Sequence, residues 1–114
     1  MNTLDKFRVR DKVVIITGGA GLLGRNHAQA VIDGEGIAVL LDISQDAIDS
    51  TLSELKDQYG KDVKATGYVC DITSRESIKR VLADLLNEYG HIDVLINNAA
   101  NNPKVEGNAF NMKP

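Results

Sequence analysis

The sequence predicts an α/β fold in which four parallel strands form a sheet with helices on both faces. Four short apolar runs alternate with three helix-like segments, and the connections between them are short. The strand-like runs are apolar almost throughout, which is typical of parallel strands that are buried on both faces. Because crossovers between parallel strands are right-handed, we expect a doubly wound sheet in the strand order third, second, first, fourth.

Length and composition indicate one domain and exclude several kinds of partner. The chain has 114 residues, with 13 basic and 16 acidic side chains and a formal net charge of −3. Because lysine and arginine form no cluster, we expect no nucleic-acid or membrane partner. No run approaches the ~20 apolar residues that span a bilayer, and residues 1–12 lack the apolar core of a signal peptide, so we expect a cytoplasmic protein. The lone Cys70 and the widely separated His27 and His91 predict no metal site.

The first expected strand covers residues 12–17, and the first expected helix covers residues 22–34. A turn with Gly18, Gly21 and Gly24 joins them. The glycines allow a tight turn and a close approach to phosphate, and the free N–H groups at the helix start point at the anion. This strand–turn–helix context predicts the pyrophosphate site of a dinucleotide in a Rossmann-type fold. The alternative is a turn with only a structural role.

The second expected strand covers residues 37–42, and Ser44 is the expected N-cap of a helix that runs to Tyr59. Asp42 ends the strand at the position that faces the adenosine ribose in this fold. A carboxylate there accepts hydrogen bonds from the ribose hydroxyls and repels a 2′-phosphate, and Ile43 offers that phosphate no cation. We therefore expect the cofactor NAD(H) and not NADP(H). The alternative is that Asp42 only caps the turn before Ser44.

The third expected strand covers residues 63–70, and Cys70 is expected to be a buried thiol. Residues 73–76 fit a capping box in which Thr73 is the N-cap of a helix that ends at Gly90. The apolar stripe of this helix is expected to consist of Ile78, Val81, Leu82, Leu85, Leu86 and Tyr89. Asp71 and Ile72 are expected beside the adenine, with the carboxylate on the exocyclic amine. The alternative is that Asp71 and Thr73 only cap the helix.

The fourth expected strand covers residues 93–97, and the periodic pattern ends there. Residues 98–114 are expected to form a loop that leads to a missing C-terminal half. The whole chain, 1–114, then forms the N-terminal part of one Rossmann domain. The glycine turn and residues 97–100 should meet at the switch point between the first and fourth strands, where a dinucleotide would lie.

These motifs together resemble the N-terminal part of a classical short-chain dehydrogenase/reductase, over essentially the whole chain. The matching segments are residues 17–24, Asp42, residues 71–73 and residues 97–100. The resemblance implies that Gly24 permits close helix packing and that Asn97 ties the central sheet together. It also implies cofactor contacts at the glycine turn and at the nicotinamide-side ribose, made by Gly18, Gly21, Leu22, Leu23, Asn98, Ala99 and Ala100.

Two features depart from the family pattern. Gly21 with Leu22 gives the glycine spacing of the extended subfamily of nucleotide-sugar epimerases and dehydratases, and Ala100 stands where a glycine is usual. Family catalysis uses a serine and a Tyr-x-x-x-Lys pair. The positions four residues after Tyr59, Tyr68 and Tyr89 hold Val63, Ile72 and Asp93. We therefore assign no catalytic residue and expect this chain to be inactive alone.

The resemblance implies that the complete protein transfers hydride between nicotinamide and an alcohol or ketone of a small-molecule substrate, as a homo-oligomer. Two alternatives stay open at this point. One is an NAD-binding module without catalysis, and the other is a fragment of an extended-type enzyme that acts on a nucleotide sugar.

Overall fold

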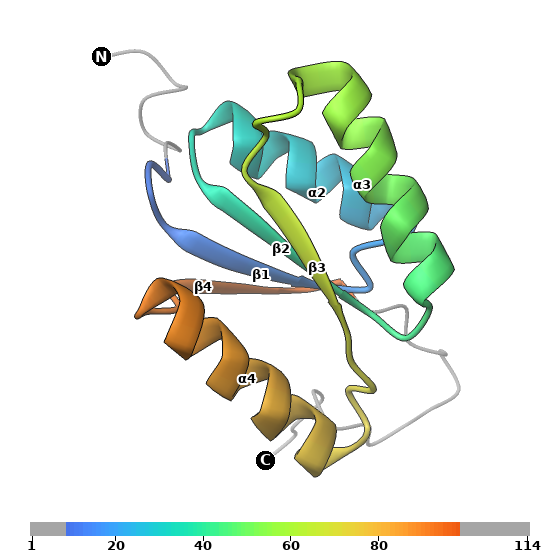
Figure 1. The fold of residues 1–114 in the computed structure, drawn as a ribbon, viewed down its shortest axis with the longest axis vertical. Coiled ribbons are helices and arrows are strands. Elements are labelled where there is room, and N and C mark those ends of the chain that lie inside the picture. Colours follow the sequence, from blue (N-terminus) through green and yellow to red (C-terminus); the bar gives the residue numbers. More distant parts are fainter. Residues whose placement is uncertain (1–8, 99–114) are drawn as a thin grey trace.

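Four parallel strands form the sheet in the order β3–β2–β1–β4 (Figure 1). The computed structural model describes residues 9–98. The strands are β1 (Val13–Thr17), β2 (Ile37–Asp42), β3 (Ala65–Val69) and β4 (Val94–Asn97). The predicted strand order and the parallel pairing are therefore confirmed.

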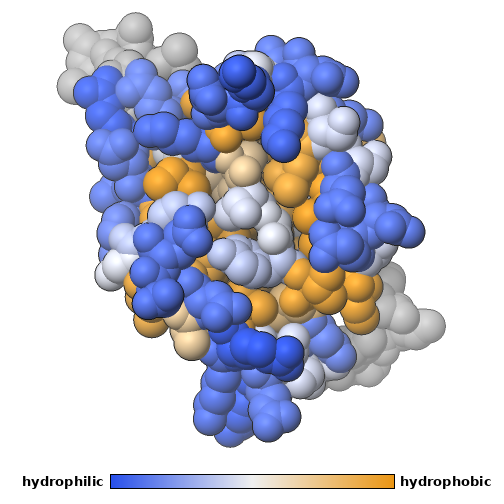
Figure 2. Space-filling view, viewed as in Figure 1, coloured by the Kyte–Doolittle hydropathy of each residue, from blue (hydrophilic) through white to orange (hydrophobic). Residues whose placement is uncertain are grey.

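Three helices cover the two faces of this sheet, namely α2 (Leu22–Asp33), α3 (Gln45–Tyr59) and α4 (Arg75–Tyr89). Figure 1 shows α2 and α3 on one face and α4 on the other, as right-handed crossovers require. Polar side chains dominate the helices, while apolar surface remains visible between them along the β3 edge (Figure 2). Within residues 9–98, no helix is both long and apolar enough to cross a membrane.

The core consists of two layers that share the central strand β1. Val13 and Ile15 pack with residues of α4, whereas Val14 and Ile16 pack with residues of α2 and α3. All five residues of β1 are buried, which explains why this strand is apolar on both faces. The lone Cys70 belongs to the α4 layer and is buried, as expected.

The N-caps of α3 and α4 follow the prediction with one correction. Ser44 is the N-cap of α3, because its hydroxyl accepts the N–H of Ala47 at 3.1 Å. The N-cap of α4 is Ser74, whose hydroxyl accepts the N–H of Ser77, so the prediction of Thr73 was wrong. Its hydroxyl instead donates to Oδ1 of Asp71 at 2.6 Å, and this competing bond delays the helix by one residue.

The second correction concerns the apolar stripe of α4. Val81 and Leu85 are buried, and most of the other expected residues pack around them. Leu86 is 50% exposed, so its assignment to the buried stripe was wrong. It lies about 100° around the helix from Leu85, and the buried face of α4 is too narrow to include both.

Candidate functional site

The candidate site lies where the carboxyl ends of β1 and β4 meet. Thr17 pairs in register with Asn97, so the residues that follow the two strands are neighbours. Nδ2 of Asn98 donates to the carbonyl of Gly18 at 3.3 Å, which joins the end of β4 to the glycine turn. This is the switch point of the strand order, where ligands bind in doubly wound sheets.

Three of the four glycines in residues 18–24, namely Gly18, Gly21 and Gly24, differ in what the fold requires of them. Gly18 has φ +65°, a left-handed conformation that favours glycine. A Cβ on Gly24 would lie 2.3 Å from the carbonyl oxygen of Gly18, so the start of α2 packs directly on the turn. A Cβ on Gly21 would meet only that same oxygen, at 3.7 Å. The fold itself therefore has room for a side chain at position 21.

The N-terminus of α2 differs from those of the other described helices. Its N-cap, Gly21, makes no side-chain capping bond, and its first turn carries no acidic residue. In contrast, α3 and α4 have serine caps together with Asp46 or Glu76 in the first turn. The first N–H groups of a helix have no partner within it. The start of α2 therefore offers N–H donors and a positive dipole end to an anion.

Apolar side chains stand exposed at this end of the molecule. Leu22, Leu23 and Ile43 are between 62% and 69% exposed and are the most exposed large apolar side chains in residues 9–98. Leu22 and Leu23 begin α2, and Ile43 follows β2. A ligand that covers them would gain roughly 25 cal/mol per Å2 of apolar surface removed from water.

The carboxylate of Asp42 is held by two backbone N–H groups at the end of β2. Its Oδ2 accepts the N–H of Ala20 at 3.2 Å, and its Oδ1 accepts the N–H of Ser44 at 3.2 Å. The capping role that sequence reasoning left as an alternative is therefore present. Because each carboxylate oxygen has two lone pairs, one acceptor site per oxygen remains for the hydroxyls of a ribose.

The side chain of Asp71 closes the turn before α4. Its Oδ1 accepts the hydroxyl and the N–H of Thr73, and these bonds lower the pKa of Asp71. These bonds lie within the turn, and the cap of α4 is Ser74, so neither Asp71 nor Thr73 caps the helix. Ile72 is half-buried against the α4 layer of the core. Contacts of these two residues with adenine stay a prediction, and Ala99 and Ala100 lie outside the described residues.

Sequence reasoning assigned no role to two threonines that are buried beside the candidate site. The buried hydroxyl of Thr17 donates to Oδ1 of Asn97 at 3.1 Å and accepts the N–H of Asn98 at 2.9 Å. The buried Thr51 of α3 donates to the carbonyl of Ala20 at 3.4 Å. Thr17 directly follows an apolar run, which was a signal available in the sequence, whereas the residues next to Thr51 are mostly polar and give none.

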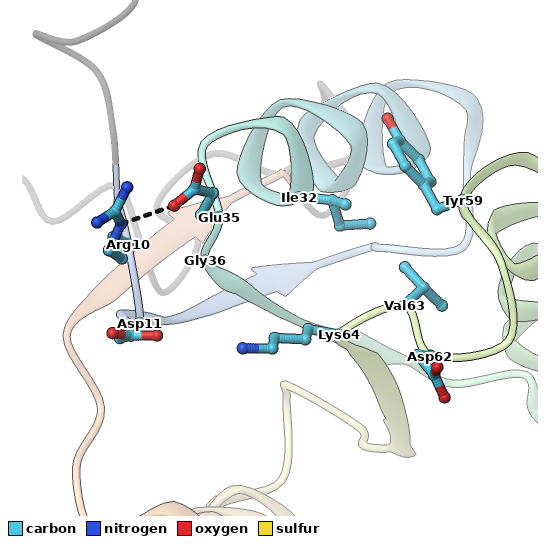
Figure 3. A pocket seen from close by; sticks show the side chains of 9 residues that line it. All are labelled: Arg10, Asp11, Ile32, Glu35, Gly36, Tyr59, Asp62, Val63 and Lys64. Atoms are coloured by element: carbon cyan, nitrogen blue, oxygen red, sulfur yellow. Dashed lines mark hydrogen bonds and ion pairs between the residues drawn. The ribbon is translucent and has the colours of Figure 1, made fainter.

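A separate cavity of about 540 Å3 lies at the amino-terminal ends of the strands, opposite the candidate site (Figure 3). Most of its lining residues precede β1, β2 or β3. Its lining includes Arg10 and Glu35, which form an ion pair, as well as Tyr59 and Lys64. None of the residues predicted to bind the cofactor lines this cavity. Within residues 9–98, no three histidine, cysteine, aspartate or glutamate side chains are grouped so that they could hold a metal ion.

Comparison with known proteins identifies the family. The sequence model described as short chain dehydrogenase matches residues 12–113. The 7alpha-hydroxysteroid dehydrogenase of Bacteroides fragilis is 33% identical over 102 residues, which cover 89% of this chain and 38% of that protein. The curated relatives in general are matched over about a third of their length.

Two solved structures have the same arrangement of strands and helices. The NAD+-bound xylitol dehydrogenase is 30% identical with a TM-score of 0.72, over 81% of this chain and 34% of that one. An actinorhodin polyketide ketoreductase with NADPH is 28% identical with a TM-score of 0.73, over 89% of this chain and 36% of that one. The chain therefore belongs to the short-chain dehydrogenase family.

Proposed function

We propose that residues 9–98 form the nucleotide-binding part of an oxidoreductase which, in the complete protein, transfers hydride between a nicotinamide cofactor and an alcohol or ketone. The observation that carries the proposal is the start of α2. It has no side-chain cap and no acidic residue, and it packs on a glycine turn at the switch point. These features suit a pyrophosphate group, which needs donors and open space.

The residues fit such a group in detail. Gly21 has φ −87° and ψ 178°, which any residue adopts, and the fold leaves room for a side chain there. The conformation of the chain therefore gives no reason for a glycine at 21, whereas a phosphate in that space does. We assign the pyrophosphate to the N–H groups of Leu22, Leu23 and Gly24, with Leu22, Leu23 and Ile43 covering the ligand.

We assign the adenosine ribose to Asp42 and the cofactor to NAD(H). The carboxylate is positioned by Ala20 and Ser44 and keeps acceptor capacity for a diol, while a 2′-phosphate would meet its negative charge. Solved relatives carry either NAD+ or NADPH. We therefore base the assignment of NAD(H) over NADP(H) on the side chains at the end of β2.

The remaining assignments concern the complete protein. When bound, the nicotinamide supplies or accepts the hydride, and residues 98–100 are assigned to the ribose next to it. The 114 residues contain no Tyr-x-x-x-Lys pair. The role of this chain is therefore to bind and orient the cofactor, and we propose a small-molecule substrate and a homo-oligomer for the complete protein.

The proposal is tested by calorimetric titration of the chain with NAD, using the variant Gly21→Val. A Cβ at position 21 has room in the fold, and the valine side chain would fill the space assigned to the pyrophosphate, so binding should weaken at least about tenfold, which corresponds to about 1.4 kcal/mol. Ser53→Val on the exposed face of α3 is the control and should bind as the parent chain does. Equal affinity of Gly21→Val and the parent chain would refute the assignment.

A further inference from the structure

The peptide group on each side of Ala20 is held by a side chain from outside the turn. The N–H of Ala20 donates to Oδ2 of Asp42 at 3.2 Å, and its carbonyl accepts the hydroxyl of Thr51 at 3.4 Å. We infer that Thr51 is a positioning residue, which sets the glycine turn, and through it the Asp42 carboxylate, for the choice between a 2′-hydroxyl and a 2′-phosphate. The inference rests on the function proposed above.

Packing alone does not explain a hydroxyl at position 51. Thr51 is 5% exposed and lies on the inner face of α3, one turn from the fully buried Ile48 and Leu55. Valine has nearly the same shape and would bury no polar atom there. A buried hydroxyl costs free energy unless it is hydrogen-bonded, and the partner of Thr51 is the carbonyl of Ala20.

The consequence for Asp42 follows from its two donors. One donor is the N–H of Ala20 in the glycine turn, and the other is the N–H of Ser44 at the cap of α3. Both together fix the plane of the carboxylate and leave its remaining lone pairs in defined directions. If the Ala20 segment rotates, Asp42 loses one of its two donors, and the carboxylate is free to turn.

A separate hydrogen bond joins α2 to α3 away from the turn, and it distinguishes this positioning role from general attachment of α3. Nε2 of Gln29 donates to Oε1 of Gln58 at 2.8 Å, on the exposed surface between α2 and α3. It touches neither Ala20 nor Asp42. Removing the Gln58 side chain therefore loosens the helix pair without acting on the turn, and Gln58→Ala is the matched control.

The experiment measures the affinity of the 114-residue chain for ADP-ribose and for ADP-ribose 2′-phosphate, which probe only the adenosine half of the site. The measured quantity is the dissociation constant of ADP-ribose 2′-phosphate divided by that of ADP-ribose. In Thr51→Val this ratio should fall about threefold or more, because a hydrogen bond that orients a charged group is lost. Thr51→Ser keeps the hydroxyl and should restore the ratio. Gln58→Ala should leave the ratio unchanged whatever its melting temperature.

The possible outcomes separate the inference from the function beneath it. If the parent chain binds neither probe, the proposed function fails and the inference fails with it. If the parent chain binds and Thr51→Val lowers only the melting temperature with the ratio unchanged, Thr51 is structural and the inference alone is overturned. Thr51→Ala, which removes the hydroxyl without adding a methyl group, makes the same comparison if the valine variant does not fold.

Discussion

The hydroxyl of Thr17 and the side-chain oxygen of Asn97 lie 3.1 Å apart and join the carboxyl ends of β1 and β4. The same hydroxyl accepts the N–H of Asn98, whose side chain in turn donates to the carbonyl of Gly18. The turn proposed to hold the pyrophosphate and the end of β4 are thus connected through Thr17 and Asn98. The switch point is a hydrogen-bonded junction as well as a topological feature.

Loss of the Thr17 hydroxyl should destabilise this junction. In Thr17→Val, Oδ1 of Asn97 loses this donor, while the N–H of Asn98 keeps its bond to the carbonyl of Ile96, and an unsatisfied polar group of this kind costs about 1–3 kcal/mol. The free energy of unfolding from urea titration should fall by that amount. Thr66→Val within β3 is the matched control and should change it much less. An equal effect of both substitutions would contradict the junction.

The two glycines at the start of α2 should differ in how much stability an alanine substitution costs. Gly24→Ala should lower the free energy of unfolding by about 1–3 kcal/mol, because the new Cβ would lie 2.3 Å from the backbone oxygen of Gly18. Gly21→Ala should cost less than about 1 kcal/mol, the ordinary effect of alanine at an N-cap. Thermal melting of both variants makes the comparison, and a reversed order would show that the turn is packed differently.

Replacing the two residues at the end of β2 should change the cofactor preference. In Asp42→Ala with Ile43→Arg, the ribose hydroxyls lose a charged acceptor worth roughly 1.5–3 kcal/mol, and a 2′-phosphate gains a cation. The preference for NADH over NADPH should narrow by more than about tenfold or reverse in a fluorescence titration.

A matched pair of substitutions controls for the change in charge. Asp46→Ala with Gln45→Arg alters the net charge equally in the first turn of α3. It should leave the preference for NADH in place. A parent chain that binds NADPH as tightly as NADH would refute the role assigned to Asp42.

The stability of the chain should depend on acid through Asp93 at the start of β4. Its Oδ2 accepts the N–H of Val13 at 2.8 Å and contacts Nδ1 of His91 at 2.7 Å. The bond from Val13, with a smaller contribution from His91, lowers the pKa of Asp93. The folded state therefore binds this proton less readily than the unfolded state does.

The sign of the effect follows from that difference. The stabilisation by Asp93 is present above the ordinary aspartate pKa and is lost as the pH falls through the lowered value. Melting temperatures measured between pH 7 and pH 3 should fall less steeply for Asp93→Asn than for the parent chain. Asp62→Asn, an exposed aspartate in the loop before β3, is the control. Parallel curves for Asp93→Asn and the parent chain would contradict this account.

The fold followed from the sequence because its determinants are local. Ser44 begins α3 as expected, and the apolar pattern of β1 gave both its position and its burial on two faces. Ser74 was missed because Asp71 competes with the helix for the hydroxyl of Thr73. That competition depends on the geometry of a turn, which residue spacing alone does not reveal.

The candidate site was predicted in its location and in part of its geometry. The glycine turn and Asn98 come together at the switch point as expected, and Asp42 accepts the N–H of Ala20 in that turn. Contacts of Ala20 with Thr51 and with Asp42 join residues 31 and 22 positions apart. They exist only after α3 has packed on the sheet, so no pattern along the chain indicated them.

The most direct test of the account is to map NAD binding on the 15N-labelled chain by NMR. We expect the largest amide shift changes in the glycine turn and the first turn of α2, from Gly18 to Gly24, with further changes at Asp42 and Ser44. The amide shifts around Arg10 and Lys64, which line the cavity at the amino-terminal ends of the strands, should stay unchanged. Changes centred on Arg10 and Lys64, with the glycine turn unaffected at saturating NAD, would contradict the assignment of the site.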